Sequence, residues 1–436
     1  MSKAFAGAAR WCSVQPREPA RGSRDGRRSG AAMANDSGAT RARPAAAEPG
    51  AAAPPGPVVH RRALLYSHDT FGLGHLRRAR AIARALTEAD PAAAALIVTG
   101  SPIAGRFDFP DRVDHVRLPG VVKLADGDYA TQNLGLALEE TVTLRGALIG
   151  AAEAAFRPDL VIVDKEATGF RNEMAGALDA ARRRGARLVL GLRDVLDAPE
   201  PLAREWARKG YVEAIRRWFD EIWIYGLPEI HRPLEGLGLG ADVMARTVYT
   251  GYLRREAPDW PEGLGEEPPE GPFVLVTAGG GGDGAPLVDW ALSAYEAEPS
   301  LGPRAVIVYG PFMPAERRAE FDRRAAALGG RVETLSFDSR IERLQAQAVG
   351  IVAMGGYNTF CEILSRDKPA VIAPRTRPRL EQFIRAEAAE RAGLVRMLHA
   401  PRDGGGPEAM ARAIRALADQ PPPSAAMRAG LLDGLE

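Results

Sequence analysis

Three glycine-containing segments hold the residues of this 436-residue chain whose types and spacing best suit chemistry. The first, residues 67–75, reads Ser-His-Asp-Thr-Phe-Gly-Leu-Gly-His. His75 can take up a proton near neutral pH, and Asp69 can orient the ring or stabilise its charge. Gly72 and Gly74 let the backbone turn tightly and approach a ligand at a helix start. The alternative is a tight turn with His75 as a capping residue, since a Gly-x-Gly pair alone is weak support for a site.

The second segment, residues 277–284, reads Thr-Ala-Gly-Gly-Gly-Gly-Asp-Gly. The backbone N–H groups of such a run can form a concave nest for a diphosphate. The segment is not a Walker loop, because no Gly-Lys-Ser/Thr follows the glycines. A flexible turn without a ligand is the alternative.

The third segment, residues 354–362, reads Met-Gly-Gly-Tyr-Asn-Thr-Phe-Cys-Glu. The backbone N–H groups of Tyr357, Asn358 and Thr359 open a helix and can meet a phosphate there. Glu362 comes one turn later, where its carboxylate can accept both hydroxyls of a ribose. The alternative for Glu362 is an acid favoured near a helix start by the helix dipole.

Three further polar residues follow the next predicted strand. Arg375 can pair with a phosphate. Glu381 and Gln382 can hydrogen-bond the hydroxyls of a sugar. A solvated loop with a helix cap is the alternative for all three.

Each of the three segments follows a short apolar run and precedes a helical pattern. We expect strands at 63–67, 95–99, 160–163, 187–190, 221–225, 273–277, 304–309, 331–335, 350–354 and 370–373. We expect helices at 76–86, 134–156, 171–184, 211–219, 285–297, 314–328, 339–347, 358–366, 381–391 and 406–420. Strands that alternate with helices predict an α/β fold with parallel sheets covered on both faces. In such sheets ligands bind at the carboxyl ends of the strands, which is where the three segments lie.

Residues 254–272 are rich in Pro, Glu and Gly and interrupt this pattern, which then starts again. We therefore predict two α/β domains, over 58–252 and 253–420. Residues 1–57 contain few large apolar side chains, so we expect a disordered basic tail there. We expect residues 421–436 to form a flexible C-terminus.

The composition narrows the class of protein. With 46% hydrophobic and 26% charged residues the chain is globular, and no stretch reaches the roughly 20 apolar residues of a membrane-spanning helix. Cys12 and Cys361 lie far apart, which argues against a disulfide framework or a metal site and favours a cytoplasmic protein. Residues 1–62 hold eleven basic and four acidic side chains, so the rest of the chain is mildly acidic. This distribution argues against a nucleic-acid binder.

One segment, residues 211–225, combines aromatic side chains with Arg216 and Arg217. Such a composition occurs in amphipathic patches that lie on a membrane. It also occurs in a helix and strand of a protein core, which is the interpretation we favour. Contact with the inner face of a membrane as a peripheral protein stays an alternative.

Taken together, the segments resemble the family-28 glycosyltransferases, a group with the GT-B fold. That group includes the N-acetylglucosaminyltransferase that makes the lipid-linked peptidoglycan precursor. The matching stretches are 68–80, 277–284 and 355–393, of which the last is the most specific. The resemblance is greatest to a bacterial subgroup of predicted glycosyltransferases with a Gly-x-Gly-His-x-x-Arg start. It implies two Rossmann-like parallel-sheet domains that face each other across a cleft.

The resemblance also implies an activity. A hexose-type sugar would pass from a nucleotide-sugar donor, usually a UDP-sugar, to an acceptor, with inversion and without a metal ion or a cofactor. The 253–420 domain would bind the donor, and the base would lie near residues 337–341. The implied contacts are Gly280, Gly281, Gly282, Gly356, Tyr357, Asn358, Thr359 and Arg375 at the diphosphate, Glu362 at the ribose, and Glu381 and Gln382 at the sugar. Ala370 stands where many retaining enzymes of this fold carry a second glutamate, which favours inversion.

The resemblance assigns the acceptor to the 58–252 domain, with His75 as the general base and the turn at Gly72 and Gly74 beside it. The first loop is less Gly-rich than in the peptidoglycan enzyme, so lipid-linked and small-molecule acceptors both stay open. Asp164 and Glu166 stand at a strand end in this domain, and we hypothesise that they help to select the acceptor. A salt-bridged loop is the alternative.

Two other functions are compatible with this architecture. One is a UDP-sugar 2-epimerase, and the other is a protein that binds a nucleotide sugar without catalysis. Release of UDP only in the presence of an acceptor would distinguish transfer from both. A dehydrogenase is disfavoured, because no complete G-x-G-x-x-G motif with a ribose-binding acid follows the first strand.

Overall fold

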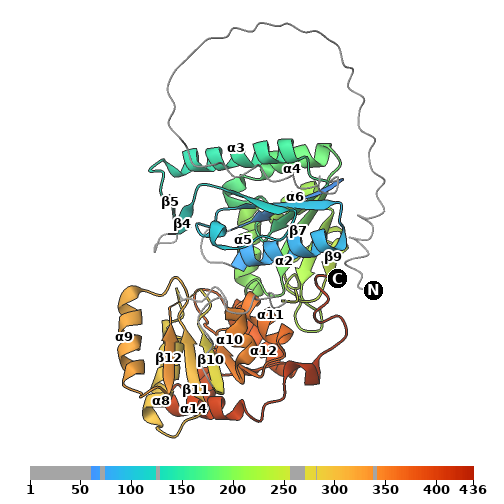
Figure 1. Cartoon of the computed structure of the whole chain (residues 1–436). Helices are drawn as coiled ribbons and strands as arrows, with labels where there is room; N and C mark the ends of the chain where they lie inside the picture. The colour runs from blue at the N-terminus through green and yellow to red at the C-terminus, as the bar shows by residue number, and fades with distance from the viewer. Residues whose placement is uncertain (1–59, 69–73, 124–127, 256–270, 281, 337–340) are drawn as a thin grey trace, which may run out of the picture.

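Two parallel β-sheets flanked by helices form the two domains, and Figure 1 shows the N-terminal domain above the C-terminal one. The computed structural model describes residues 60–68, 74–123, 128–255, 271–280, 282–336 and 341–436. Asp69, Gly72 and Gly281 lie outside these residues, as do residues 1–57 and 337–340. The predictions made for them are therefore not addressed by the structure.

The N-terminal sheet has seven strands, and all of its neighbouring strands are parallel. In spatial order they are β3 (Val113–Arg117), β2 (Ala93–Thr99), β1 (Arg61–Ser67), β6 (Leu160–Asp164), β7 (Arg187–Arg193), β8 (Glu221–Tyr225) and β9 (Thr247–Tyr249). The central strands are continuous apolar runs, because helices cover both faces of a parallel sheet. A separate antiparallel ribbon consists of β4 (Val121–Lys123) and β5 (Tyr129–Thr131).

Helices of the N-terminal domain bury apolar stripes against this sheet. The predicted stripe on α2 (Gly74–Ala89) is confirmed, since Leu76, Ala79, Ile82, Ala83 and Leu86 are all buried. The other helices are α3 (Leu138–Phe156), α4 (Ala175–Arg183), α5 (Pro199–Lys209), α6 (Tyr211–Trp218) and α7 (Ala241–Met244). The aromatic residues Trp218, Phe219 and Trp223 of segment 211–225 lie in the core, and so does Ile222. The membrane-patch interpretation of this segment is therefore wrong, and the core interpretation is confirmed.

The C-terminal sheet has six parallel strands. In spatial order they are β12 (Val332–Leu335), β11 (Arg304–Val308), β10 (Phe273–Thr277), β13 (Gly350–Ala353), β14 (Ala370–Ile372) and β15 (Arg396–Met397). The helices are α8 (Ala285–Ala297), α9 (Ala315–Ala326), α10 (Ile341–Gln347), α11 (Tyr357–Ser365), α12 (Glu381–Arg391), α13 (Ala400–Asp403) and α14 (Pro407–Ala416). Figure 1 shows α10, α11 and α12 at the edge of this domain that faces α2.

The end of the chain returns to the N-terminal domain, and the C label in Figure 1 lies beside that domain. Leu431 and Leu432 are buried, and the backbone N–H of Tyr252 donates to the Leu431 carbonyl over 2.7 Å. Here the structure differs from the flexible C-terminus that we expected, because two apolar side chains near the end of the segment pack into the core.

One apolar core is continuous across both domains. Tyr252, from the segment that joins the sheets, packs edge-on against Phe360 with ring centroids 5.2 Å apart and stacks on Tyr357 at 6.1 Å. Both partners belong to α11 of the C-terminal domain. The two domains thus share packed side chains at α11, which also contacts α2. No helix within the described ranges is long and apolar enough to cross a membrane.

Candidate active site

The predicted segments lie at the topological switch point of each sheet. In the N-terminal sheet β1 lies between β2 and β6, and in the C-terminal sheet β10 lies between β11 and β13. Ligands of open α/β sheets bind at such points, beyond the carboxyl ends of the strands. Residues 67–75 follow β1, residues 277–284 follow β10 and residues 354–362 follow β13. The two points face each other, because the Asn358 side-chain amide donates to the Gly74 carbonyl over 3.1 Å.

His75, the predicted base, lies in the first turn of α2 and contacts the end of β6. Its Nδ1 is 2.7 Å from Oδ2 of Asp164. Arg78, one turn along α2, donates from Nη2 to the same oxygen over 2.6 Å. Burial opposes ionisation of Asp164, but Arg78 and His75 outweigh it and hold the pKa of this carboxyl well below its usual range. A permanent carboxylate therefore faces the histidine, which is the role that we had predicted for Asp69.

Glu166, predicted beside Asp164 on the acceptor side, has a different environment. Lys209 donates to its Oε2 over 2.6 Å, Tyr211 donates to the same oxygen, and Lys165 lies 3.2 Å from Oε1. Burial raises the pKa of Glu166, but Lys165 and the neighbouring cations outweigh it and lower that pKa. The side chain is thus held in a salt-bridged cluster. Nearby, burial keeps the pKa of His68 well below its ordinary value, so His68 is neutral at pH 7.

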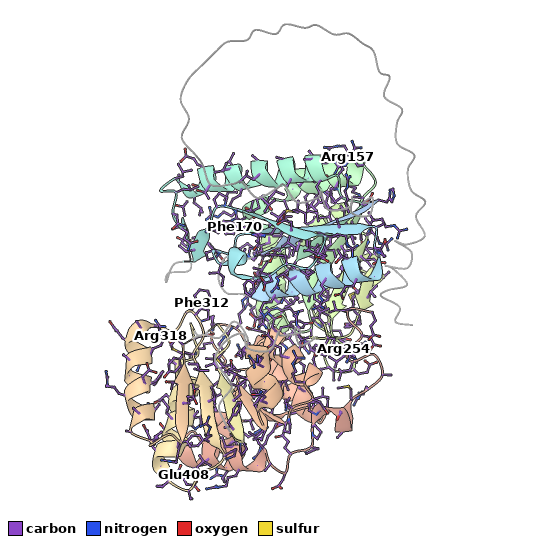
Figure 2. All side chains as sticks on the ribbon, in the orientation of Figure 1. Arg157, Phe170, Arg254, Phe312, Arg318 and Glu408 are labelled. Carbon is purple, nitrogen blue, oxygen red and sulfur yellow. The ribbon has the colours of Figure 1, made fainter. Side chains whose placement is uncertain are left out.

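The glycine loop after β10 packs against the loop after β11. The N–H of Phe312 donates to the Gly280 carbonyl over 2.9 Å. Gly310 has a φ of 89°, and a Cβ there would lie 2.3 Å from the Gly279 carbonyl oxygen, so only glycine fits. Figure 2 labels Phe312 at the edge of the C-terminal domain that faces the other domain. Gly282 is exposed.

The turn after β13 leads into α11 through two glycines. Gly355 has a φ of 80°, and a Cβ there would lie 2.6 Å from Ile372. Gly356 is the N-terminal cap residue of α11. Tyr357 is buried, whereas Asn358 accepts a hydrogen bond from Arg255 over 2.8 Å and reaches α2. The positive ends of α2 and α11 therefore lie close together, and both favour an anion between them.

Glu362 is buried one turn into α11, as predicted. Its Oε2 accepts a hydrogen bond from Gln345 over 2.6 Å. Its Oε1 is in ion-pair contact with Arg77 of α2 at 2.7 Å. Arg77 also donates to Glu342 over 2.6 Å. A ribose at Glu362 would therefore share this carboxylate with an arginine from the other domain.

Arg375, Glu381 and Gln382 form one network, as their predicted common site requires. Arg375 donates to Oε1 of Glu381 over 2.7 Å, and its backbone N–H donates to Oε1 of Gln382 over 3.1 Å. The guanidinium also pairs with Asp283 of the glycine loop. Oε2 of Glu381 is buried and accepts no hydrogen bond from described residues. Arg375 is already paired with Glu381 and Asp283, so a phosphate would have to compete with these two carboxylates.

The sequence reasoning missed a buried ion pair that joins the domains. Arg385 of α12 donates to both carboxylate oxygens of Asp194, over 2.5 Å from Nη2 and 2.8 Å from Nε. It also donates to the Gly355 carbonyl over 3.0 Å, while Tyr252 donates to Asp194 over 3.0 Å. This pair fixes the turn of Gly355 against the carboxyl end of β7. Each residue by itself resembles an ordinary strand-end or helix charge, so the sequence offers little signal for the pair.

A cavity of about 350 Å³ lies beyond the carboxyl ends of β7 and β8. Its lining residues include Asp197, Ile230 and His231. Asp197 accepts a hydrogen bond from the backbone N–H of Leu380, which precedes α12, so the cavity adjoins the domain interface. Within the described ranges, no three His, Cys, Asp or Glu side chains are grouped as metal ligands.

No protein-family model matches the sequence, and no curated protein matches it. Solved structures do match, over most of their lengths. A structure titled as the glycotransferase of kitacinnamycin has a TM-score of 0.55 at 16% identity, with 87% of this chain and 95% of that chain covered.

The fold is GT-B.

Two further structures with this fold carry nucleotides. The glycosyltransferase VinC in complex with DTDP matches with a TM-score of 0.54 at 19% identity, covering 86% of this chain and 95% of that one. UGT2 from Phytolacca americana, solved with UDP-2-fluoro-glucose and pterostilbene, matches with a TM-score of 0.55 at 14% identity, covering 84% and 92%. At these identities the likeness establishes the arrangement of the two domains.

Proposed function

We propose that the chain is a glycosyltransferase that moves a hexose-type sugar from a nucleotide-sugar donor to an acceptor hydroxyl, with inversion and without a metal ion. The donor domain is 253–420 and the acceptor domain is 58–252. UDP is the expected nucleotide. Structures of the same fold were solved with DTDP and with a UDP-sugar, which supports a nucleoside diphosphate as the common element.

The observation that carries this proposal is a pair of buried carboxylate oxygens at the donor positions. Oε2 of Glu381 accepts no hydrogen bond within the described structure, and Oε1 of Glu362 meets an arginine, Arg77, that is shared with Glu342. A buried acceptor without a donor costs about 1–3 kcal/mol, so such atoms are uncommon unless a ligand completes them. Glu362 is the position implied for ribose hydroxyls and Glu381 the position implied for sugar hydroxyls. Hydroxyl groups of a nucleotide sugar are donors that would pair with Oε2 of Glu381 and would replace or join Arg77 at Oε1 of Glu362.

The diphosphate is the leaving group in this proposal. Backbone N–H groups at the start of α11 and in the loop of Gly280 and Gly282 would face it, in keeping with the dipole of the helix. Fixed dipoles of this kind stabilise negative charge as it develops, without rearrangement during the reaction. The bond between the anomeric carbon and the diphosphate oxygen would break as the acceptor oxygen attacks from the opposite face.

The proton of the acceptor hydroxyl would pass to His75. In this proposal the neutral ring carries its proton on Nδ1 and donates it to Asp164 in preference to accepting from Arg78, which lies 2.9 Å from the same nitrogen. The lone pair on Nε2 is then the basic site. As Nε2 takes the proton, the imidazolium gains charge stabilisation from Asp164, which stays ionised because Arg78 lowers its pKa. General-base catalysis of this type contributes roughly 10²–10⁴-fold to the rate.

Calorimetric titration with UDP, GDP and dTDP tests the donor site. We expect selective binding of UDP, and a loss of about tenfold to a hundredfold in Glu362→Gln, the range for hydrogen bonds to a charged group. Glu342→Gln is the matched control, because Glu342 also binds Arg77 yet is not a predicted donor contact. Equal losses in both variants would assign the effect to Arg77 and would contradict a ribose contact at Glu362.

Release of UDP from UDP-sugars then tests transfer. We expect release to depend on an added acceptor and to fall at least a hundredfold in His75→Ala, with the affinity for UDP unchanged. Binding of nucleoside diphosphates without release would instead indicate a binding protein, and interconversion of UDP-sugars would indicate an epimerase. No binding of any nucleoside diphosphate would overturn the proposal.

A further inference from the structure

The acids near the carboxyl ends of β6 and β7 are already paired with basic side chains. Glu166 and Glu205 share Lys209, at 2.6 and 2.8 Å. Arg379, from the C-terminal domain, donates to Glu205 over 2.9 Å. Arg385 holds Asp194, and Arg78 holds Asp164. These contacts therefore already balance the negative charges of this surface, and the surface carries a further cation.

That cation is Arg193, the last residue of β7. Its Nε is buried and makes no hydrogen bond, and its guanidinium forms no ion pair with any described residue. Burial first, and then the like charge of Arg78, lower the pKa of Arg193 to about 10. The residue as a whole is partly exposed. A buried N–H that donates to no group is unfavourable in the free protein, because the hydrogen bond it lost to water is not replaced.

The position of Arg193 is central to the candidate active site. Asp164 pairs with Gly191 in the sheet register, so Arg193 extends beyond the same sheet edge as the partner of His75. Apart from burial, Arg193 exerts the largest effect on the pKa of Glu381, the implied donor-sugar contact, and lowers it. Arg193 and the partner of His75 therefore lie at the same end of the N-terminal sheet.

We propose that Arg193 binds an oxyanion on the acceptor, either a phosphate or a carboxylate group. This inference rests on the proposed function and extends it to the class of acceptor. The guanidinium presents a planar fork of N–H donors that matches two oxygens of either group. Lys165 adds positive charge at the same end of the sheet, where its backbone N–H donates to the Gly191 carbonyl over 2.8 Å, two residues before Arg193.

The acceptor is the favoured source of the oxyanion. The diphosphate of the donor is assigned to the glycine loop and to the start of α11, both in the C-terminal domain. Arg193 instead extends from the sheet of the N-terminal domain, at the edge where the acceptor hydroxyl would meet His75. An anionic group near that hydroxyl would place the acceptor without using the contacts of the donor.

The test is calorimetric titration of inorganic phosphate and, separately, of acetate into the full chain, with and without saturating UDP. The variants are Arg193→Gln, which keeps the size but removes the charge, and Arg193→Lys, which keeps the charge but removes the fork. Arg208→Gln is the matched control, because it removes one exposed cation from the neighbouring helix α5. Arg193→Gln breaks no hydrogen bond or ion pair among the described residues and removes only a longer-range attraction to Glu381, so we expect it to fold and to bind UDP within twofold of the original protein.

We expect phosphate or acetate to bind in the presence of UDP, at least tenfold more weakly in Arg193→Gln, with partial recovery in Arg193→Lys and no change in Arg208→Gln. Preference for one of the two probes identifies the group. Equal binding in Arg193→Gln, meaning an adventitious ion only, would overturn the proposal, as would no binding at all. A tenfold loss of UDP affinity in Arg193→Gln with phosphate binding unchanged would assign Arg193 to the donor and also overturn it. Failure of the original protein to bind UDP would instead refute the proposed function, and the phosphate comparison without UDP would still test Arg193.

Discussion

Arginine–carboxylate pairs join the domains, and two of them, at Arg385 and at Arg77, differ in their surroundings. Arg385 and Asp194 are each 1% exposed, and the guanidinium meets both carboxylate oxygens. The side chain of Arg77, by contrast, is 24% exposed and divides its contacts between Glu342 and Glu362. In the first pair one guanidinium serves one carboxylate, whereas in the second pair Glu362 has to share its arginine with another acid.

We infer from this difference that the Arg385–Asp194 pair has a structural role, whereas the role of the Arg77–Glu362 pair depends on a ligand. A buried pair with several additional hydrogen bonds is costly to break, because removal of one member leaves an unpaired buried charge. Arg385 and Asp194 are further held by Gly355 and Tyr252, so a ligand has little to gain there. Arg77 contacts the carboxylate that the resemblance assigns to ribose. We therefore expect Arg385–Asp194 to control stability and Arg77–Glu362 to control nucleotide affinity.

The largest expected effect follows from breaking the first pair. Asp194→Ala would leave Arg385 charged and buried, and we expect it to lower the free energy of unfolding by about 3–5 kcal/mol. Urea unfolding followed by circular dichroism measures this change. The double variant Asp194→Ala/Arg385→Leu removes both charges and should recover part of the loss. A decrease of less than about 1 kcal/mol in the single variant would contradict a structural role for the pair.

A further buried pair, Arg78–Asp164, can be compared with these two because it lies within one domain and beside His75. Asp164 has a lower pKa folded than unfolded, so the folded protein binds fewer protons. The pair therefore stabilises the fold at pH values above about 4, near the ordinary pKa of an aspartate, and this stabilisation is lost as the pH falls further. We expect Asp164→Asn to cost about 1.5–3 kcal/mol at pH 7 and less at pH 3.

Urea unfolding of the original protein and of Asp164→Asn at pH 7 and pH 3 tests this dependence. Other carboxylates also titrate over the range, but they contribute to both proteins and cancel in the difference. A difference between the two proteins that is the same at both pH values would show that Asp164 is not stabilised by its charge. Asp220→Asn, at a partly exposed pair with Arg182, is a suitable control.

Breaking the Arg77–Glu362 pair should change the affinity for UDP. In Arg77→Gln the carboxylate of Glu362 loses its competing cation, and we expect UDP to bind about threefold to tenfold more tightly, roughly 0.7–1.4 kcal/mol. Calorimetry at low and high salt measures the change. Arg84→Gln, further along α2 and partly exposed, is the matched control. Weaker binding of UDP to Arg77→Gln would show that Arg77 assists the nucleotide and would reverse the assignment.

A helix or strand could be predicted from the sequence where its pattern of apolar residues is continuous. Strand β10 and helix α8 have the predicted bounds, since each is a long apolar or amphipathic run between glycines or prolines. The edge strand β15 has two residues and could not be seen. Helix α5 was missed because only Leu202 and Trp206 of its eleven residues are buried, which leaves a weak apolar period.

In the candidate site, too, only residues within a local sequence pattern could be predicted. His75 and Glu362 stand in local motifs, and the structure places both at the domain interface as expected. Their partners do not stand in any motif: Asp164 is 89 residues from His75, and Asp194 is 191 residues from Arg385. A single sequence carries no spacing signal over such separations. Arg193 was missed for the related reason that its lack of a partner is a property of the folded chain only.

The smallest expected effect comes from a pair at the surface, which completes the series from buried to exposed. Arg204 and Glu200 are 67% and 83% exposed and lie four residues apart on α5. Water screens such a pair, and fixing two long side chains costs entropy, so we expect Arg204→Ala to change the free energy of unfolding by less than about 0.5 kcal/mol. Urea unfolding in low and high salt checks this. A loss comparable to that of Asp194→Ala would mean that burial does not explain why the interdomain pairs differ.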